Sequence, residues 1–188
     1  MRRPERRRGA ALFVPLETER LLLEPIRADH ANAMFEGLRE PSLYAYQTDE
    51  PPRDAASLRA RYARLASGHS TDELAHWFNW IFVRRDDGAA AGYVQATLWK
   101  DLSSAEIGYL TLPAHQRRGF GAEAVGTMAS HLLHGGVGAL HAVIDERNAG
   151  SIALIEGLGF TRTRTRRSDD VIGGVRWLDH EYVLRRRS

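Results

Sequence analysis

The feature that most constrains the fold of this chain is a change of hydrophobic periodicity near its middle. Residues 76–85, HWFNWIFVRR, and 90–99, AAGYVQATLW, are rich in the aromatic and β-branched residues that favour strands. Between them, the DDG segment at residues 86–88 tolerates the positive φ of a hairpin turn. A further strand over residues 105–112 ends at Pro113. The sequence therefore predicts an antiparallel meander.

Helical spacing precedes this meander. In residues 30–40 the apolar side chains recur every three to four residues, behind Asp29, a residue type that caps helix N-termini. A second helix is predicted to begin at Arg53 or Asp54 and to end at the SGHS segment, residues 67–70. Two helices are therefore expected before the first strand of the meander.

Helices and strands also follow the meander. Residues 121–134 have helical spacing and stop at two glycines. A short buried strand over residues 140–145 and a helix within 148–160 come next, before an arginine-rich strand and a closing strand at 175–184. One more strand is expected near the N-terminus, over residues 17–26. The economical architecture is one sheet with helices packed on its faces.

Composition narrows the functional classes. The chain has 188 residues, enough for one well-buried domain, and 43% hydrophobic with 27% charged residues is typical of a globular protein. It contains no cysteine, which excludes disulfides, thiolate metal sites and a cysteine nucleophile. No stretch approaches about 18 apolar residues, and the basic N-terminus lacks the apolar core of a signal peptide. We therefore expect a cytoplasmic protein with no membrane partner.

Arginines gather in three clusters, at residues 1–8, 162–167 and 185–187, although the net charge is only +2. Such clusters can hold phosphates by electrostatic attraction, so weak contact with RNA or the ribosome is one interpretation. The alternative is that terminal charge runs are simply solvated. We expect residues 1–14 to form a flexible basic arm ahead of a single domain at 15–188.

The segment PAHQRRGFGAEA, residues 113–124, is the most distinctive motif. Glycines at Gly119 and Gly121 let a backbone pass close to a ligand, and Arg117 and Arg118 attract negative charge. The helix that follows adds the positive end of its dipole, so the segment favours a diphosphate. A P-loop is excluded, because no lysine followed by Ser or Thr stands in the required place.

Two other interpretations of this motif are open. The spacing from Gly119 through Gly121 to Ala124 matches a dinucleotide-binding fingerprint, and Asp145 follows at roughly the expected distance. However, residues 113–118 separate the first glycine from its strand, and the chain after Asp145 lacks room for a doubly wound domain. Alternatively, the glycines form only a strand-to-helix turn, which leaves the arginines unexplained.

With these residues in view, the sequence resembles the GCN5-related N-acetyltransferases (GNAT). The segment QRRGFG is similar to the family loop that holds the pyrophosphate of acetyl-coenzyme A (acetyl-CoA). The resemblance extends to LETERLLLEPI, to AEIGYLTLP and to IDERNAGSIALIEGLGF followed by DHEYVL, and it runs from about residue 16 to 185. Within this family, the sequence is similar to the RimJ/RimL branch, whose known members acetylate the N-termini of ribosomal proteins.

The resemblance implies an α+β fold of three layers, α/β/α. Its mixed, mostly antiparallel twisted sheet would have about six to seven strands, helices on both faces, and a split between residues 105–112 and 140–145. Acetyl-CoA would be the co-substrate, with its pantetheine arm in the split and its diphosphate on the loop. The binding residues so implied are Leu110, Thr111, Leu112, Gln116, Arg117, Arg118, Gly119, Phe120, Gly121, Ala122 and Asn148.

Acetyl transfer to an amine needs a base and a proton donor. An α-amino group has a pKa of about 7.7–8.0, so a base completes its deprotonation, and Glu106 matches the acidic position of the resembled branch. Ile155 stands where many family members supply a tyrosine to the thiolate, which leaves Ser151 or water. The alternatives are that Glu106 is an exposed strand residue and that the Ser151 hydroxyl bonds its own helix. Without a cysteine nucleophile, direct transfer in a ternary complex is expected.

The acceptor implied by the resemblance is a primary amine, most readily a peptide or protein N-terminal α-amine. A small amine, such as an amino-acid derivative or antibiotic, is the alternative within the enzyme class, and a non-catalytic RNA- or ribosome-binding module is the alternative outside it. The aromatic loop at residues 41–52 could wall the acceptor pocket. No metal is expected, because His131 and His134, beside His141, lack carboxylates at ligand spacing. Both a monomer and a homodimer fit the sequence.

Overall fold

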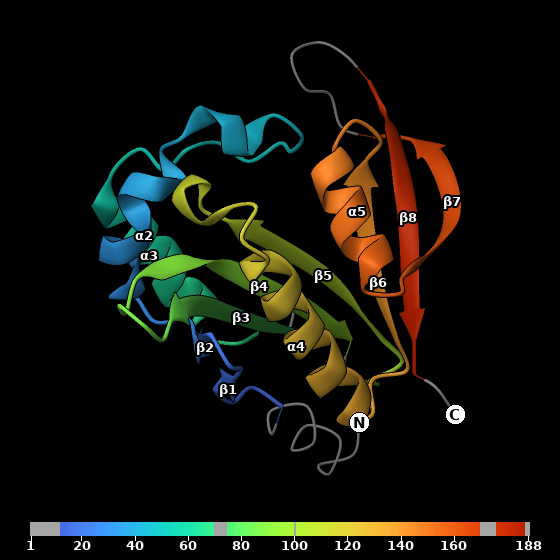
Figure 1. Cartoon of the computed structure of the whole chain (residues 1–188), viewed down its shortest axis with the longest axis horizontal. Coiled ribbons are helices and arrows are strands. Elements are labelled where there is room, and N and C mark those ends of the chain that lie inside the picture. Colours follow the sequence, from blue (N-terminus) through green and yellow to red (C-terminus); the bar gives the residue numbers. More distant parts are fainter. Residues whose placement is uncertain (1–11, 70–74, 100, 170–175, 187–188) are drawn as a thin grey trace.

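The structure is a computed structural model that describes residues 12–69, 75–99, 101–169 and 176–186. The described residues form one eight-stranded sheet in the order β1-β2-β3-β4-β5-β6-β8-β7, with helices packed on it (Figure 1). The strands are β1 (Leu16–Glu17), β2 (Leu21–Pro25), β3 (Ala75–Arg84), β4 (Ala90–Trp99), β5 (Ser104–Thr111), β6 (Ala139–Asp145), β7 (Thr161–Arg167) and β8 (Leu178–Arg185). The helices are α2 (His30–Leu38), α3 (Ala55–Leu65), α4 (Phe120–His134) and α5 (Ala149–Gly157), with 3₁₀ turns η1 (Pro41–Tyr44) and η2 (Pro113–His115).

The predicted meander forms the centre of the sheet. β3 pairs antiparallel with β4, and β4 pairs antiparallel with β5. Gly88 has φ of 73°, which supplies the positive φ that the predicted hairpin turn requires. The predicted meander is therefore confirmed, and it forms three neighbouring strands.

The N-terminal strand differs from the prediction. In place of one strand over residues 17–26, β1 ends at Glu17 and β2 begins at Leu21. The Thr18 hydroxyl oxygen accepts the N–H groups of Arg20 and Leu21 at 3.2 and 2.8 Å, and this turn lets β1 pair antiparallel with β2. The sheet of the described residues therefore has eight strands, slightly more than the six to seven predicted, because a two-residue strand leaves no periodic signal.

Local capping explains where α3 begins but not where α2 begins. The Asp54 carboxylate accepts the N–H of Ser57 at 2.6 Å, and the Ser57 hydroxyl accepts the N–H of Asp54 at 3.3 Å, so α3 starts at a capping box. Asp29 precedes α2 as predicted, but its backbone is helical and its side chain makes no capping bond. Instead, its carboxylate pairs with Arg27 at 3.3 Å. The expected cap at Asp29 was therefore wrong.

Helices cover both faces of the sheet, as predicted (Figure 1). On one face, α4 packs through Val125, Met128 and Leu132, which belong to the main core together with β3 and β4. On the other face, α2 and α3 pack through Met34 and Leu58 in a second core. Within the described ranges, no helix is both long and apolar enough to cross a membrane.

Residues 12–14 pack on the sheet. Leu12 is buried, Phe13 stacks on Phe78 with ring centres 5.1 Å apart, and the Val14 carbonyl accepts the indole N–H of Trp80 at 2.8 Å. These three residues belong to the segment for which the sequence predicts a flexible arm. Residues 1–11 of that segment lie outside the described residues.

The sheet splays open between β5 and β6. These strands pair in parallel over residues 104–106 and 139–141. Beyond this point β5 continues along β4 to Thr111, while β6 continues along β8 to Asp145. The two strands diverge between α4 and α5 (Figure 1), so the predicted split is confirmed.

Candidate active site

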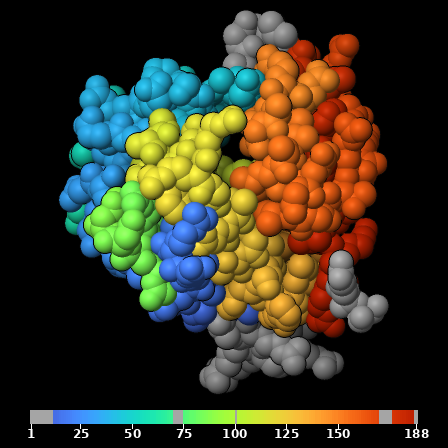
Figure 2. All heavy atoms as spheres, in the orientation of Figure 1, coloured from blue at the N-terminus to red at the C-terminus, as the bar shows by residue number. Residues whose placement is uncertain are grey.

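Three adjoining cavities follow the split. The loop cavity, of about 670 Å³, lies between η1, the end of β5, the start of α4 and α5. Figure 2 shows its opening between the segment after β5 and α5. The split cavity, of about 230 Å³, lies between β5 and β6, and the α3 cavity, of about 390 Å³, lies between α3 and the sheet. The loop and split cavities share Tyr46, Gln47, Tyr109, Asn148 and Ser151, whereas the split and α3 cavities share Asp49, Arg61, Tyr93 and Gln95.

Main-chain geometry shapes the loop cavity. After η2 the chain turns through positive φ at Arg117, 58°, and Gly119, 82°, before α4 begins at Phe120. No side chain of the described residues caps α4, so the N–H groups of its first turn are available to an anion. A Cβ at Gly121 would lie 2.7 Å from Thr111 Oγ1. A side chain at Gly121 would therefore force Thr111 to shift where α4 passes β5.

Most of the predicted binding residues meet at this cavity. Its lining includes Leu110, Thr111, Gln116, Arg117, Gly119, Gly121, Ala122 and Asn148. The Gln116 side chain donates to the Thr111 carbonyl at 3.0 Å, so that carbonyl already has a partner. Leu112 is buried in the core under α2 and α3, and its N–H donates to the Ala91 carbonyl at 2.9 Å. Arg118 and Phe120 line a separate hollow with Arg20 on the outer side of the loop.

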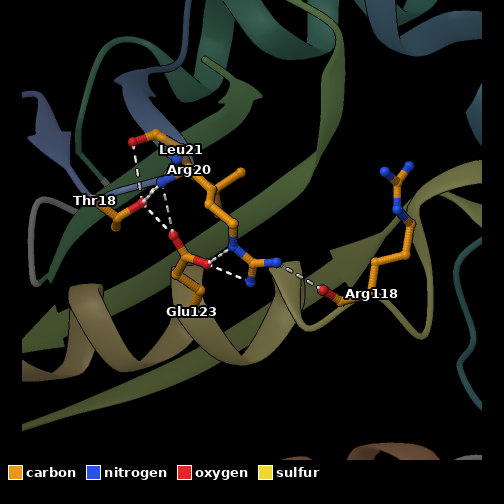
Figure 3. Close-up of polar contacts among 5 residues, drawn as sticks. All are labelled: Thr18, Arg20, Leu21, Arg118 and Glu123. Carbon is orange, nitrogen blue, oxygen red and sulfur yellow. Dashed lines mark hydrogen bonds and ion pairs between the residues drawn. The ribbon is translucent and has the colours of Figure 1, made fainter. Parts of the chain in front are cut away.

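The Arg118 carbonyl belongs to a polar cluster that ties the β1–β2 turn to the start of α4 (Figure 3). Arg20 donates to the Arg118 carbonyl at 3.0 Å and to the Glu123 carboxylate at 2.7 Å, while Thr18 donates to Glu123 at 2.5 Å. The Arg20 and Arg118 guanidinium groups lie 4.8 and 5.1 Å from the centre of the Phe120 ring. Burial opposes ionisation of Glu123, but hydrogen bonds from Thr18 and Arg20 lower its pKa. The cluster fixes the loop from outside.

The start of α5 forms the opposite wall. Asn148 caps this helix, because its side-chain oxygen accepts the Ser151 N–H at 3.1 Å. The Tyr109 hydroxyl donates to the Ser151 carbonyl at 3.2 Å and so joins β5 to α5 across the split. Burial raises the pKa of Tyr109 to about 12, which keeps its hydroxyl protonated at neutral pH. Among the described residues the Ser151 hydroxyl has no hydrogen-bond partner, so it is not bonded to its own helix.

Glu106 lies outside the three cavities. It is exposed on β5, opposite Thr97 of β4 and His141 of β6. The next two residues, Ile107 and Gly108, line the split cavity. Glu106 therefore stands beside the closed end of the split, and its assignment as the base stays a prediction.

Two carboxylates of the split cavity, Asp145 and Asp49, were not among the sequence-predicted site residues. The Asp145 side chain is only 1% exposed and accepts Arg147 Nε at 2.9 Å. Burial opposes its ionisation, but hydrogen bonds from Arg147 lower its pKa. Asp49 pairs with Arg61 at 2.9 Å. A charged residue at the end of the apolar 140–145 strand was a usable signal for Asp145, whereas the loop around Asp49 has none.

The aromatic loop at residues 41–52 walls the cavities. Tyr46 lines the loop and split cavities, and Tyr44 lines the α3 cavity. The Arg147 guanidinium lies 5.8 Å from the Tyr46 ring centre and 5.3 Å from that of Trp177. Arg147 therefore contacts both sides of the split at its open end.

The histidines considered as metal ligands have other partners. His131 Nε2 is 2.8 Å from the Leu12 carbonyl oxygen, and His134 Nδ1 is 2.8 Å from the Ser130 carbonyl oxygen. In the part of the chain that the structure describes, no group of three His, Cys, Asp or Glu side chains is placed to hold a metal ion.

Sequence comparisons agree with this geometry. Residues 20–161 match the model of the acetyltransferase (GNAT) domain family. The uncharacterized N-acetyltransferase YoaA of Bacillus subtilis (strain 168) is 28% identical over 156 residues, which cover 80% of this chain and 85% of that protein. An L-methionine sulfoximine/L-methionine sulfone acetyltransferase of Salmonella typhimurium is 30% identical over 107 residues, 55% of this chain and 62% of that protein.

Solved structures share the fold at low sequence identity. A GNAT-family acetyltransferase from Bacillus anthracis has a TM-score of 0.80 at 15% identity, covering 92% of this chain and 98% of its own. The ribosomal-protein-S5-alanine acetyltransferase of Vibrio fischeri has a TM-score of 0.76 at 18% identity, covering 92% and 97%. RimL, a ribosomal L7/L12 α-N-protein acetyltransferase in complex with coenzyme A, has a TM-score of 0.79 at 14% identity, covering 89% and 95%. Because the family model spans most of the chain, this protein belongs to the acetyltransferase (GNAT) domain family and is an acyltransferase.

Proposed function

We propose that this enzyme transfers an acetyl group from acetyl-CoA to a primary α-amine, directly within a ternary complex. The observation that carries the proposal is the main-chain turn at residues 116–122, which opens the uncapped end of α4 into the loop cavity. This cavity continues into the split cavity through shared lining residues, including Tyr109 and Ser151. A carrier bound at the turn and an amine entering from the α3 side would therefore meet between β5 and β6.

The residues of the turn fit a diphosphate. Arg117 lines the cavity, and the first-turn N–H groups of α4 add the positive end of the helix dipole. Glu123 lies in the same first turn and would oppose an anion, but its charge is paired with Arg20. Because Gly121 has no side chain, a ligand can approach the backbone there. The complex of RimL with coenzyme A, on the same fold, supports this ligand class.

Acetyl-CoA supplies the acetyl group as a thioester. The neutral acceptor amine forms the new amide C–N bond as the C–S bond breaks, so the amine gives up one proton and the sulfur gains one. The protein holds acetyl-CoA and the amine together in the split, and this proximity contributes to the rate of transfer. We assign Glu106 as the base that takes the amine proton, acting through a water because it lies beside the cavity rather than in it.

Ser151, directly or through a water, is the group assigned to return a proton to the sulfur. It lines the loop and split cavities, where the thioester would lie. Its hydroxyl is free among the described residues, whereas the Tyr109 hydroxyl already donates to the Ser151 carbonyl. A leaving thiol has a pKa of about 8.5, so this proton transfer assists the reaction without limiting it.

Two acceptor classes have support. Ribosomal-protein acetyltransferases share the fold, which supports a peptide or protein N-terminus. The 30% identical relative that acetylates methionine sulfoximine and methionine sulfone supports a small amine. Both acceptors present an α-amine, so the same chemistry serves either.

Thiol release from acetyl-CoA, measured with a thiol-reactive dye, tests the proposal. We expect release only when an amine is present, with the N-acetyl product identified by mass spectrometry and coenzyme A binding measured by calorimetry. If the protein neither binds coenzyme A nor releases thiol with free amino acids and peptides, the proposed function is wrong.

A further inference from the structure

We infer that the acceptor is a free α-amino acid, whose carboxylate and ammonium groups bind the Asp49–Arg61 ion pair and whose side chain enters the α3 cavity. This inference rests on the acetyl transfer proposed above and adds the identity of the acceptor. It is carried by the position of the ion pair, by its unused hydrogen-bonding groups and by the unpaired Tyr62 hydroxyl in the cavity beyond it.

The Asp49–Arg61 pair stands at the junction of two cavities. Arg61 projects from α3 and Asp49 from the loop after η1, and both line the split cavity and the α3 cavity. Their side chains are 48% and 49% exposed, so a ligand in either cavity can reach them. The split cavity also contains Ser151 and Tyr109, where the acetyl group would be delivered. An amine held by Asp49 would therefore lie next to the reacting carbonyl.

The pair has spare bonding capacity. One nitrogen of Arg61, Nη2, donates to one oxygen of Asp49, Oδ2, at 2.9 Å. A guanidinium has five N–H donors and a carboxylate has two acceptor oxygens, so most of the guanidinium and the second Asp49 oxygen have no partner among the described residues. A ligand carboxylate can take the free Arg61 donors while a ligand ammonium donates to Asp49.

A zwitterion matches this arrangement of charges. In a free α-amino acid the carboxylate and ammonium are separated by one carbon, so each can face its opposite charge in the pair. A peptide N-terminus carries the ammonium but has a neutral carbonyl in place of the carboxylate. A polyamine would place only positive charge beside Arg61. Among amine acceptors, the pair therefore favours the free amino acid.

The α3 cavity fits a side chain with a polar end. Its apolar lining includes Ile26, Leu38, Leu58, Leu65 and Leu110. Tyr62 is only 4% exposed, and among the described residues its buried hydroxyl has no hydrogen-bond partner. Buried polar groups are normally hydrogen-bonded, so this hydroxyl indicates a ligand group that completes it.

Size and protonation refine the side chain. A cavity of about 390 Å³ holds a side chain of medium length. Burial raises the pKa of Tyr62 well above its usual value, so its hydroxyl is a donor at neutral pH. The preferred side chain therefore has an apolar stem and ends in a hydrogen-bond acceptor. Glutamine is the matching probe, and norleucine is its apolar counterpart.

The first test compares acceptors by thiol release. We expect L-glutamine to be preferred over L-glutamine amide and over a tetrapeptide with N-terminal glutamine by at least about tenfold in kcat/KM, as for loss of a charged hydrogen-bond partner. Arg61→Gln should lower kcat/KM for the free acid by about the same factor and lower it much less for the amide, which has no carboxylate to lose its partner. Arg59→Gln is the matched control, because Arg59 is exposed on the same helix and lines none of the three cavities.

Tyr62→Phe tests the polar end separately. It should reduce the preference for glutamine over norleucine while the preference for the free acid over its amide stays intact. Calorimetry with coenzyme A present gives a second readout, in which glutamine binds wild type and Arg59→Gln but binds Arg61→Gln at least about tenfold more weakly. This binding result supports the inference independently of turnover.

Two outcomes contradict the inference while leaving acetyl transfer intact. One is that peptides or amides are acetylated as efficiently as the free acid, and the other is that Arg61→Gln lowers activity on acid and amide equally. Failure of every amine to release thiol would instead contradict the proposed function.

Discussion

The loop cavity and the α3 cavity, which are the proposed carrier end and acceptor end of the site, both adjoin the split cavity, and different parts of the chain build them. The loop cavity is shaped by main chain: a positive-φ turn, the uncapped end of α4 and the missing side chain of Gly121. The α3 cavity is shaped by side chains, with the Asp49–Arg61 pair at its entrance and Tyr62 in its wall. The cavity proposed to bind acetyl-CoA therefore depends on backbone geometry, whereas side-chain substitutions alone can change the cavity proposed for the acceptor.

The two ends also differ in how they are held. The loop is tied to the β1–β2 turn by Thr18, Arg20 and Glu123, which makes its conformation part of the fold (Figure 3). At the acceptor end, the ion pair that joins the loop after η1 to α3 is half-exposed, and pairs of this kind add little to stability. Substitutions at the loop should therefore affect coenzyme binding, and substitutions near the acceptor should affect turnover.

The largest effect is expected from Gly121→Val, which places a side chain in the main-chain turn of the loop cavity. A Cβ there would lie 2.7 Å from Thr111 Oγ1 and 3.3 Å from Leu154 Cδ1, so the side chain would obstruct the turn. The dissociation constant for coenzyme A should rise on the order of 100-fold, measured by calorimetry. Gly157→Ala is the control, because nothing lies within 4 Å of a Cβ at Gly157. Unchanged affinity in a folded Gly121→Val protein would count against the site.

Glu106→Gln tests the acceptor end. It should lower kcat by about tenfold to a hundredfold, at the low end for a general base, because the amine needs little help near neutral pH. The KM for acetyl-CoA should stay nearly constant, and the loss should shrink as the pH rises above the pKa of the amine. Glu36→Gln, at a side chain 78% exposed on α2, is a control. Weaker coenzyme binding with normal kcat would remove Glu106 as the base.

Arg20→Gln tests whether contacts outside the loop cavity hold the loop in place, because Arg20 contacts the loop from that side. Losing its bonds to the Arg118 carbonyl and to Glu123 should raise the dissociation constant of coenzyme A about tenfold, with the acceptor KM unchanged. A double-mutant cycle with Glu123→Gln should show coupling of about 1 kcal/mol. Arg85→Gln is the control, since Arg85 lines the same outer hollow but its side chain donates to Glu17 and to the Thr18 carbonyl rather than to Arg118 or Glu123. Equal effects of Arg20→Gln and Arg85→Gln would contradict this role.

The smallest effect is expected in the pH dependence of the free energy of unfolding, through Asp145 of the split cavity. Arg147 lowers the pKa of Asp145 below its unfolded value of about 3.9. The pair therefore stabilises the fold above pH 3.9 or so, and this contribution is lost as the pH falls through the folded-state pKa. The difference in free energy of unfolding between wild type and Asp145→Asn, measured with urea, should be present at neutral pH and shrink in acid. A difference independent of pH would contradict the assignment.

Patterns along the chain explain which features could be predicted. The meander and α3 follow from local periodicity and capping, and the loop follows from glycines that the backbone itself requires at Gly119 and Gly121. Contacts between distant segments could not be predicted in this way. Arg20 and Glu123 are 103 positions apart, and Asp49 meets Arg61 only because η1 and α3 fold onto the same side of the split. The α3 cavity depends on such contacts, so no local sequence motif predicts it.

A crystal structure with bound coenzyme A tests the central claim most directly, namely that main-chain amides of the turn hold the diphosphate. The expected result places the diphosphate oxygens within hydrogen-bond distance of the N–H groups of residues 120–122, with the thiol beside Ser151. Coenzyme A bound elsewhere, with the loop cavity empty, would contradict the claim.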